Sequence, residues 1–190
     1  MSTITIARLR ERFSGHEPVC ADSTDRIEAA VAIVLAPNAD WQLDVLFIKR
    51  AEVEGDPWSG QMAFPGGRRE DGDATLQATA QRETFEETGV VLADSTVVGV
   101  LDDLVPMTPV LPPIVVRPFV FSLPERPRIT PSSEVALHLW TPLDRLPRST
   151  GRTDIRLRGV QRSMPAFLVG PHVVWGMTHR ILKSLFDLAL

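Results

Sequence analysis

Three glutamates, Glu83, Glu86 and Glu87, follow Arg82 within six residues of chain. A helix turns by about 100° per residue, so the three carboxylates would share a sector of roughly 100° on one face. Like charges at this spacing repel each other, and Arg82 offsets only part of the charge. Mg²⁺ or Mn²⁺, which prefer oxygen ligands, would offset the rest. The segment therefore predicts a metal site with Glu83, Glu86 and Glu87 as candidate ligands.

An ordinary solvated charged face is the alternative for a glutamate-rich helix. Apolar residues are expected on both sides of this helix: Leu76, Ala80 and Val90 beside the glutamates, and Ala78 and Phe85 opposite them. Both sides are therefore expected to contact protein, and carboxylates that point inward would need a cation. This pattern favours the metal site.

A glycine pair precedes the expected helix in Phe64-Pro65-Gly66-Gly67, and Gly67 lies fifteen residues before Arg82. Paired glycines let backbone groups approach an ion or a phosphate where a side chain would obstruct. A Pro-Gly-Gly turn is ordinary structure when it stands alone. Combined with the acidic helix at this spacing, it makes Gly66 and Gly67 candidates for cofactor or substrate binding.

The elements that must position these residues are mostly strands. We expect strands at residues 27–35 and 43–48, as a hairpin, and at 62–64, 97–101, 114–121, 135–140, 155–160 and 166–175. Helices are expected at residues 4–13, 73–88 and 177–190, the second ending at Gly89. The predicted fold class is α/β, a mixed β-sheet between helices. Residues 1–24 would form an N-terminal helix or arm, and residues 25–190 one domain.

The bulk composition excludes several classes of protein. The chain has 190 residues, 44% of them hydrophobic, and a net charge of −4, which gives no general attraction for nucleic acid or anionic membrane. No signal-peptide core is present, and no apolar run reaches the ~18 residues of a membrane span. Cys20 is the single cysteine, which excludes an intrachain disulfide. We expect a cytoplasmic protein without nucleic-acid or membrane partners, and the sequence leaves a homodimer open.

The combined pattern resembles the Nudix signature. That signature reads Gly, five residues, Glu, seven residues, Arg-Glu, an aliphatic residue, any residue, Glu-Glu, any residue, Gly and an aliphatic residue. The matching residues are Gly67, Arg82, Glu83, Glu86, Glu87, Gly89 and Val90. Asp73 stands in the place of the first glutamate, one extra residue separates Asp73 from Arg82, and Thr84 replaces the aliphatic residue.

The resemblance implies a Nudix-like α/β/α sandwich that hydrolyses a nucleoside diphosphate linked to another group, with Mg²⁺ or Mn²⁺ as cofactor. It makes Glu83 and Glu87 the leading metal ligands. Glu86 would be a third ligand or the partner of Arg82, which would orient the carboxylates. Arg82 and Glu83 are catalytic candidates. The resemblance implies a general base that is either a helix glutamate or an acid on a later loop, and Glu134, which precedes a strand, is the candidate for the second. An exposed glutamate at the entry to that strand is the alternative.

The resemblance implies a small-molecule diphosphate as the substrate. Lys49-Arg50-Ala51 and the stretch from Gly60 to Gly67 resemble the upstream motif of the coenzyme A pyrophosphatase branch, which adds Arg50 to the binding candidates. Gly55 stands where that branch carries an arginine, and one extra residue precedes Gly60. The resemblance implies cleavage of coenzyme A or acyl-coenzyme A into adenosine 3′,5′-bisphosphate and a phosphopantetheine. Nucleotide sugars, ADP-ribose and nucleoside triphosphates are the alternatives, and an inert Nudix-fold module that only binds nucleotide is the alternative of another class.

Two further stretches are candidates for contacts with the substrate. One is a lysine-free set of arginines that would bind phosphate or form a solvated hairpin: Arg145, Arg148, Arg152, Arg156, Arg158 and Arg162. The other runs from Pro106 to Pro131 and is rich in proline, and its stiff loops would line the pocket or a subunit contact.

Overall fold

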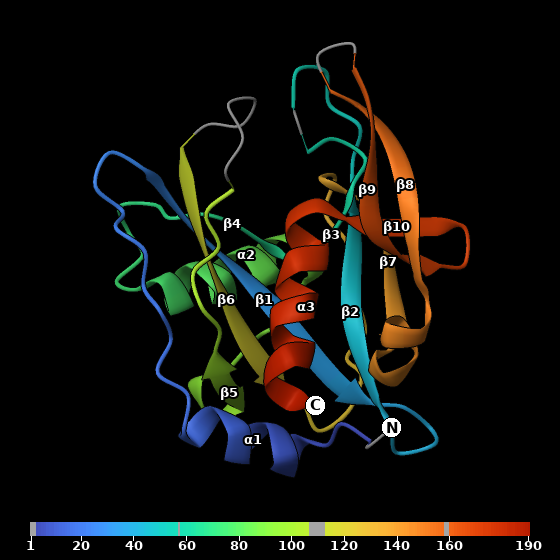
Figure 1. Ribbon diagram of the computed structural model, residues 1–190. Coiled ribbons are helices and arrows are strands. Elements are labelled where there is room, and N and C mark those ends of the chain that lie inside the picture. The colour runs from blue at the N-terminus through green and yellow to red at the C-terminus, as the bar shows by residue number, and fades with distance from the viewer. Residues whose placement is uncertain (1–2, 57, 107–112, 158–159) are drawn as a thin grey trace.

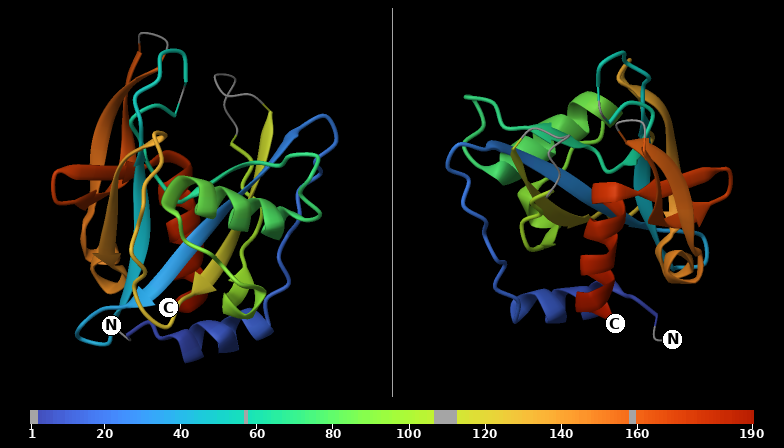
Figure 2. Two further views of the ribbon diagram at one scale, coloured as in Figure 1. Left: turned by 180° about the vertical axis from the view of Figure 1, so that it is seen from behind. Right: turned by 45° about the horizontal axis from the view of Figure 1, so that its top comes forward.

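The computed structural model describes residues 3–56, 58–106, 113–157 and 160–190 (Figure 1). Two helices, α2 (Leu76–Thr88) and α3 (Gly176–Ala189), lie on opposite faces of a twisted sheet, as the view from behind in Figure 2 also shows. A shorter helix, α1 (Ile6–Ser14), lies across one end. This arrangement confirms the predicted α/β/α sandwich.

The main sheet is mixed. Its strands are β1 (Ile27–Pro37), β2 (Leu43–Arg50), β3 (Met62–Ala63), β4 (Gly66–Arg68), β5 (Val97–Val100), β6 (Ile114–Ser122) and β7 (Val135–Pro142). The order is β3-β2-β1-β6-β5, with β4 also paired to β1 and β7 to β2. The long pair β1 and β6 is parallel, from Ile27 opposite Ile114 to Leu35 opposite Ser122, and the other pairs are antiparallel. The predicted hairpin of β1 and β2 is confirmed.

A second sheet has the order β10-β9-β8, with β8 (Thr150–Leu157), β9 (Val160–Val169) and β10 (His172–Trp175). The prediction of two strands at residues 155–160 and 166–175 was wrong here. Gly170 has a φ of +57°, so the chain turns at this residue and divides the second expected strand into β9 and β10. Two 3₁₀ turns, η1 (Asp94–Thr96) and η2 (Leu143–Arg148), complete the described elements.

Strand β1 gives the sheet two different faces, because alternate side chains point to opposite sides. Ile33 and Leu35 belong to the hydrophobic core shared with α3. Ala30, Ala32 and Ala36 are fully buried in the core shared with α2. Small side chains on this second face let α2 lie close to the strand, which brings its glutamates within reach of the glycine turn.

The helix ends are explained by local caps. Helix α2 begins at Leu76 rather than at the predicted Asp73, because Thr75 is extended and its hydroxyl accepts the Ala78 N–H at 3.1 Å. It ends as predicted at Gly89, which has a φ of +73°. The predicted N-terminal helix is present as α1, and its Phe13 ring lies directly over Gly99 of β5. Within the described ranges, no helix is long and apolar enough to cross a membrane.

Candidate active site

The carboxylates of α2 pack directly on the backbone of β4. Glu87 is 2% exposed, and its Oε2 accepts the Gly66 N–H at 2.9 Å. A Cβ atom at Gly67 would overlap the carboxylate of Glu83. Gly66 has a φ of +151°, and a Cβ there would run into the backbone of Ala30 and Val31. The glycine pair is therefore required by this helix-to-turn contact.

The electrostatics of the two carboxylates favour a cation beside them. Burial raises the pKa of Glu87 to about 7, and the nearby charges of Glu83 and Glu134 add to the rise. The hydrogen bond from the Gly66 N–H and the charge of Arg50 lower this pKa in part. Burial also raises the pKa of Glu83, against the attraction of Arg82. A positive ion between the carboxylates would offset this repulsion.

The donor set fits an open metal site. Within the part of the chain that the structure describes, no three acidic, histidine or cysteine side chains form a group that could hold a metal alone. Glu83 and Glu87 would therefore share an ion with backbone oxygens, water or substrate phosphates. Mg²⁺ commonly binds this way, through one or two carboxylates plus phosphate and water.

Arg82 lies at the centre of an ion-pair network beside these carboxylates. Its Nη1 donates to Glu83 at 3.0 Å and to Glu86 at 2.9 Å. Its Nε and Nη2 donate to both oxygens of Asp73, at 3.0 and 2.9 Å, and Nη2 also donates to the Arg68 carbonyl at 3.0 Å. The side chain of Glu86 is 54% exposed and pairs with Arg82, which is one of the two roles that the resemblance implied.

The departures from the signature are accommodated locally. Asp73 is buried ahead of the helix, where Arg82 holds the pKa of its carboxyl well below the usual range, so the extra residue leaves the contact with Arg82 intact. Thr84 is buried like the aliphatic residue it replaces, and its hydroxyl donates to the Ala80 carbonyl at 2.7 Å. The expected burial of the outer side of α2 was wrong. Phe85 is 54% exposed, because α2 forms the outer layer of the sandwich.

A pocket of about 570 Å³ opens beside the carboxylates. Six of the predicted site residues line it: Arg50, Gly66, Gly67, Glu83, Glu87 and Glu134. Arg82 and Glu86 are not among the lining residues: Arg82 contacts Glu83, which lines the pocket, and Glu86 contacts Arg82. Glu134 stands at the start of β7, where its own carbonyl accepts the Ala51 N–H at 2.7 Å.

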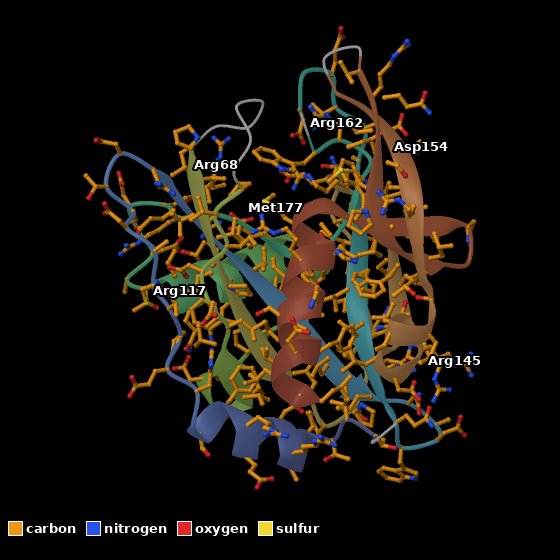
Figure 3. All side chains as sticks on the ribbon, in the orientation of Figure 1. Arg68, Arg117, Arg145, Asp154, Arg162 and Met177 are labelled. Carbon is orange, nitrogen blue, oxygen red and sulfur yellow. The ribbon has the colours of Figure 1, made fainter. Side chains whose placement is uncertain are left out.

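Several lining residues were missed by the sequence analysis. Arg68 extends from β4, and Asp56 binds Arg50 with Oδ2 at 3.1 Å from Nη2. Met177, in the first turn of α3, also lines the pocket, and Figure 3 labels it near the upper end of that helix. Arg68 could have been found, since it directly follows the glycine pair. The sequence analysis did not place Met177 at the site, because only the packing of α3 on the sheet brings it here.

Of the arginines from Arg145 to Arg162, those that the structure describes do not line the pocket. Arg158 lies outside the described residues. Arg152 is instead bound across the second sheet to Ser163, at 2.9 Å from Nε to Oγ. Figure 3 shows Arg145 and Arg162 far apart along that sheet and its flanking turn. In the proline-rich segment, residues 107–112 lie outside the described residues, while Ile114 and Val116 line the pocket.

Comparison with known proteins identifies the family. The NUDIX domain family matches residues 26–159. The chain belongs to the Nudix hydrolase family. Over 190 residues it is 32% identical to an uncharacterised Nudix hydrolase, NudL, of Cronobacter sakazakii, an alignment that covers 97% of this chain and 94% of the relative. An uncharacterised protein of Schizosaccharomyces pombe is 36% identical over 154 residues, and the alignment covers 77% of this chain but only 43% of that longer protein.

Solved structures share the Nudix fold. A MutT/nudix family protein from Enterococcus faecalis superposes with a TM-score of 0.60 at 19% identity, covering 95% of this chain and 68% of that one. A bifunctional NMN adenylyltransferase/ADP ribose pyrophosphatase from Francisella tularensis, crystallised with AMP and a manganese ion, gives a TM-score of 0.58 at 14% identity over 97% of this chain and 46% of that one. The chain therefore belongs to a family of pyrophosphohydrolases, which act on nucleoside diphosphate derivatives.

Proposed function

We propose that this Nudix chain hydrolyses the diphosphate bond of a nucleoside diphosphate derivative with Mg²⁺ or Mn²⁺ held by Glu83 and Glu87, and that coenzyme A or acyl-coenzyme A is its substrate. The observation that carries the proposal is the pair of carboxylates that meet the glycine turn inside one pocket. The manganese ion of the Francisella tularensis neighbour supports the choice of Mn²⁺ beside Mg²⁺.

The side chains have separate roles in this mechanism. Glu83 and Glu87 bind the cation, and Arg82 holds Glu83 in place through its 3.0 Å hydrogen bond. The bound cation supplies charge neutralisation at the diphosphate and a more acidic water. Glu134 accepts the proton of the attacking water as general base. Gly66 and Gly67 let the turn pack against β1 and against the Glu83 carboxylate, which keeps both carboxylates beside the pocket.

The coenzyme A assignment is supported by the sequence match around Arg50 and by the position of Arg50 in the pocket wall. Two features weigh against this assignment. Gly55 stands where the coenzyme A branch usually carries an arginine, and Arg50 already forms an ion pair with Asp56. A cytoplasmic location and a homodimer stay predictions.

A substrate panel tests this function. We expect coenzyme A to give the highest kcat/KM with Mg²⁺ among coenzyme A, its 3′-dephospho form, ADP-ribose, nucleotide sugars and nucleoside triphosphates, with adenosine 3′,5′-bisphosphate and a phosphopantetheine as products by mass spectrometry. If the kcat/KM for ADP-ribose or a nucleotide sugar exceeds that for coenzyme A by more than about tenfold, roughly 1.4 kcal/mol of transition-state stabilisation, the assignment to the coenzyme A branch is wrong. The proposed diphosphate chemistry would still stand. Binding of these compounds without turnover would favour the inert module instead.

Arg68 is expected to bind a phosphate of the substrate. Of the two arginines in the pocket wall, Arg50 is paired with Asp56, whereas Arg68 has no ion-pair partner among the described side chains. Arg68→Gln should therefore raise KM about tenfold, the loss of one charge-assisted hydrogen bond, with little change in kcat. Arg145→Gln, at an exposed arginine outside the pocket, is the control. An unchanged KM in Arg68→Gln would remove Arg68 from the binding site.

A further inference from the structure

The loop at residues 123–134, which we term the β6–β7 loop, is docked on the last turn of α2. Its Thr130 N–H donates to the Thr88 carbonyl at 2.8 Å, and its Ser132 N–H donates to the Glu87 carbonyl at 3.0 Å. The last carbonyls of a helix have no partners within the helix, so this loop supplies them. The loop is therefore attached to the same turn that carries the candidate metal ligand Glu87.

The end of the loop fixes Glu134 from two sides. The Glu134 N–H donates to Ser132 Oγ at 3.3 Å, and the Glu134 carbonyl accepts the Ala51 N–H at 2.7 Å. Ala51 directly follows Arg50, which lines the pocket. The backbone of Glu134 thus connects the α2 side of the pocket to the β2 side, and its side chain lines the same pocket as Glu83 and Glu87.

The middle of the loop is anchored outside the pocket by a buried charge. The Arg126 guanidinium forms an ion pair with Asp44, whose side chain is 3% exposed, and it lies over the Trp140 ring at 5.8 Å. Asn38 Nδ2 donates to the other oxygen of Asp44 at 2.9 Å. The Asp44 carboxylate is buried, whereas the Arg126 side chain is 37% exposed, so Arg126 offsets a buried charge from the surface, and its removal would leave that charge without its cation. Neither Asp44 nor Arg126 lines the pocket.

We propose that the Asp44–Arg126 ion pair is a positioning device for Glu134. It pins the β6–β7 loop to β2, so that the hydrogen bonds of Thr130 and Ser132 to α2 hold the Glu134 carboxylate toward Glu83 and Glu87. Arg126 is a positioning residue, because it acts on the reaction through Glu134. This inference rests on the proposed role of Glu134 as general base.

A double-mutant cycle tests the proposal, with kcat and KM measured on coenzyme A and on ADP-ribose in Mg²⁺. Glu134→Gln is expected to lower kcat about a hundredfold or more, as loss of a general base does. Arg126→Gln should lower kcat about tenfold at unchanged KM, and Arg126→Lys should restore most of the loss. In the Glu134→Gln background, Arg126→Gln should cause no further loss, because the residue that it positions is already disabled. Arg128→Gln, at an exposed arginine of the same loop, is the matched control and should keep kcat unchanged.

Hydrogen exchange adds a reading that does not depend on activity. Exchange at the Thr130 and Ser132 amides should become faster in Arg126→Gln and stay unchanged in Arg128→Gln. If Arg126→Gln fails to fold because Asp44 is left unpaired, the cycle is run with Asp44→Asn/Arg126→Gln, which removes both charges.

Three outcomes overturn the proposal: additive losses in the cycle, wild-type kcat in folded Arg126→Gln, or unchanged exchange at both amides. A wild-type kcat in Glu134→Gln removes the base role and this inference together. In that case, an inactive Glu83→Gln would show that the proposed hydrolysis itself still stands.

Discussion

Glu83→Gln and Glu87→Gln are each expected to lower kcat by about a thousandfold or more without unfolding the protein. An amide keeps the shape of the side chain but removes the charge that binds a hard cation, and loss of that cation removes several kcal/mol of transition-state stabilisation. Glu86→Gln should cost much less, because Glu86 is exposed and contacts Arg82 rather than the pocket. The measurement is kcat at saturating Mg²⁺, with circular dichroism to confirm the fold.

The same prediction can be checked by removing the metal. Activity should vanish in excess chelator and return with Mg²⁺ or Mn²⁺. Mg²⁺ should also raise the melting temperature of the wild-type protein by mass action, and this rise should be lost in Glu83→Gln. Full activity in chelator, or a variant order in which Glu86→Gln is the most damaging, would contradict the assignment.

Gly67→Ala is expected to lower kcat about a hundredfold, although it adds a single methyl group. The new Cβ would occupy the position of the Glu83 carboxylate, so Glu83 must move away from its place beside the pocket. A displacement of about 1 Å at a catalytic group can cost this much. Gly72→Ala is the matched control, because a Cβ at Gly72 meets no atom within 4 Å. Gly67→Ala with wild-type kcat and Mg²⁺ dependence would show that the contact between Glu83 and the turn is dispensable.

Sequence reasoning predicted the features that depend on local geometry. Gly89 marked the end of α2 because a left-handed backbone requires glycine there, and the spacing of Glu83 and Glu87 placed both carboxylates at one pocket. The start of α2 was three residues too early, since Thr75 caps the helix and Asp73 stays outside it to bind Arg82. No local pattern distinguishes the two roles of Glu86, because its exposure beside Arg82 depends on how far α2 is rotated against the sheet.

Features that depend on distant segments could not be predicted. The division of the last expected strand is an exception, because Gly170-Pro171 is a local turn signal that closes the β9–β10 hairpin and could have been recognised. The exposure of Phe85 depends on α2 being an outer layer, which helix periodicity alone does not reveal. The pairing of Asp44 with Arg126 joins residues 82 positions apart, so no local pattern indicates it.

Strands β1 and β6 are parallel neighbours, with Ile27 opposite Ile114. The chain that leaves the far end of β1 must therefore cross back to the starting end before β6 can pair with β1 at the centre of the sheet. The glycine turn and α2 lie in the connection between β1 and β6, and Glu134 lies after β6, at the start of β7. Non-local parallel pairing of this kind forms slowly, because loop closure precedes any gain from contacts. The pocket therefore cannot assemble from a short fragment. During synthesis, affinity for a divalent ion at this site should arise only after most of the polypeptide has left the ribosome.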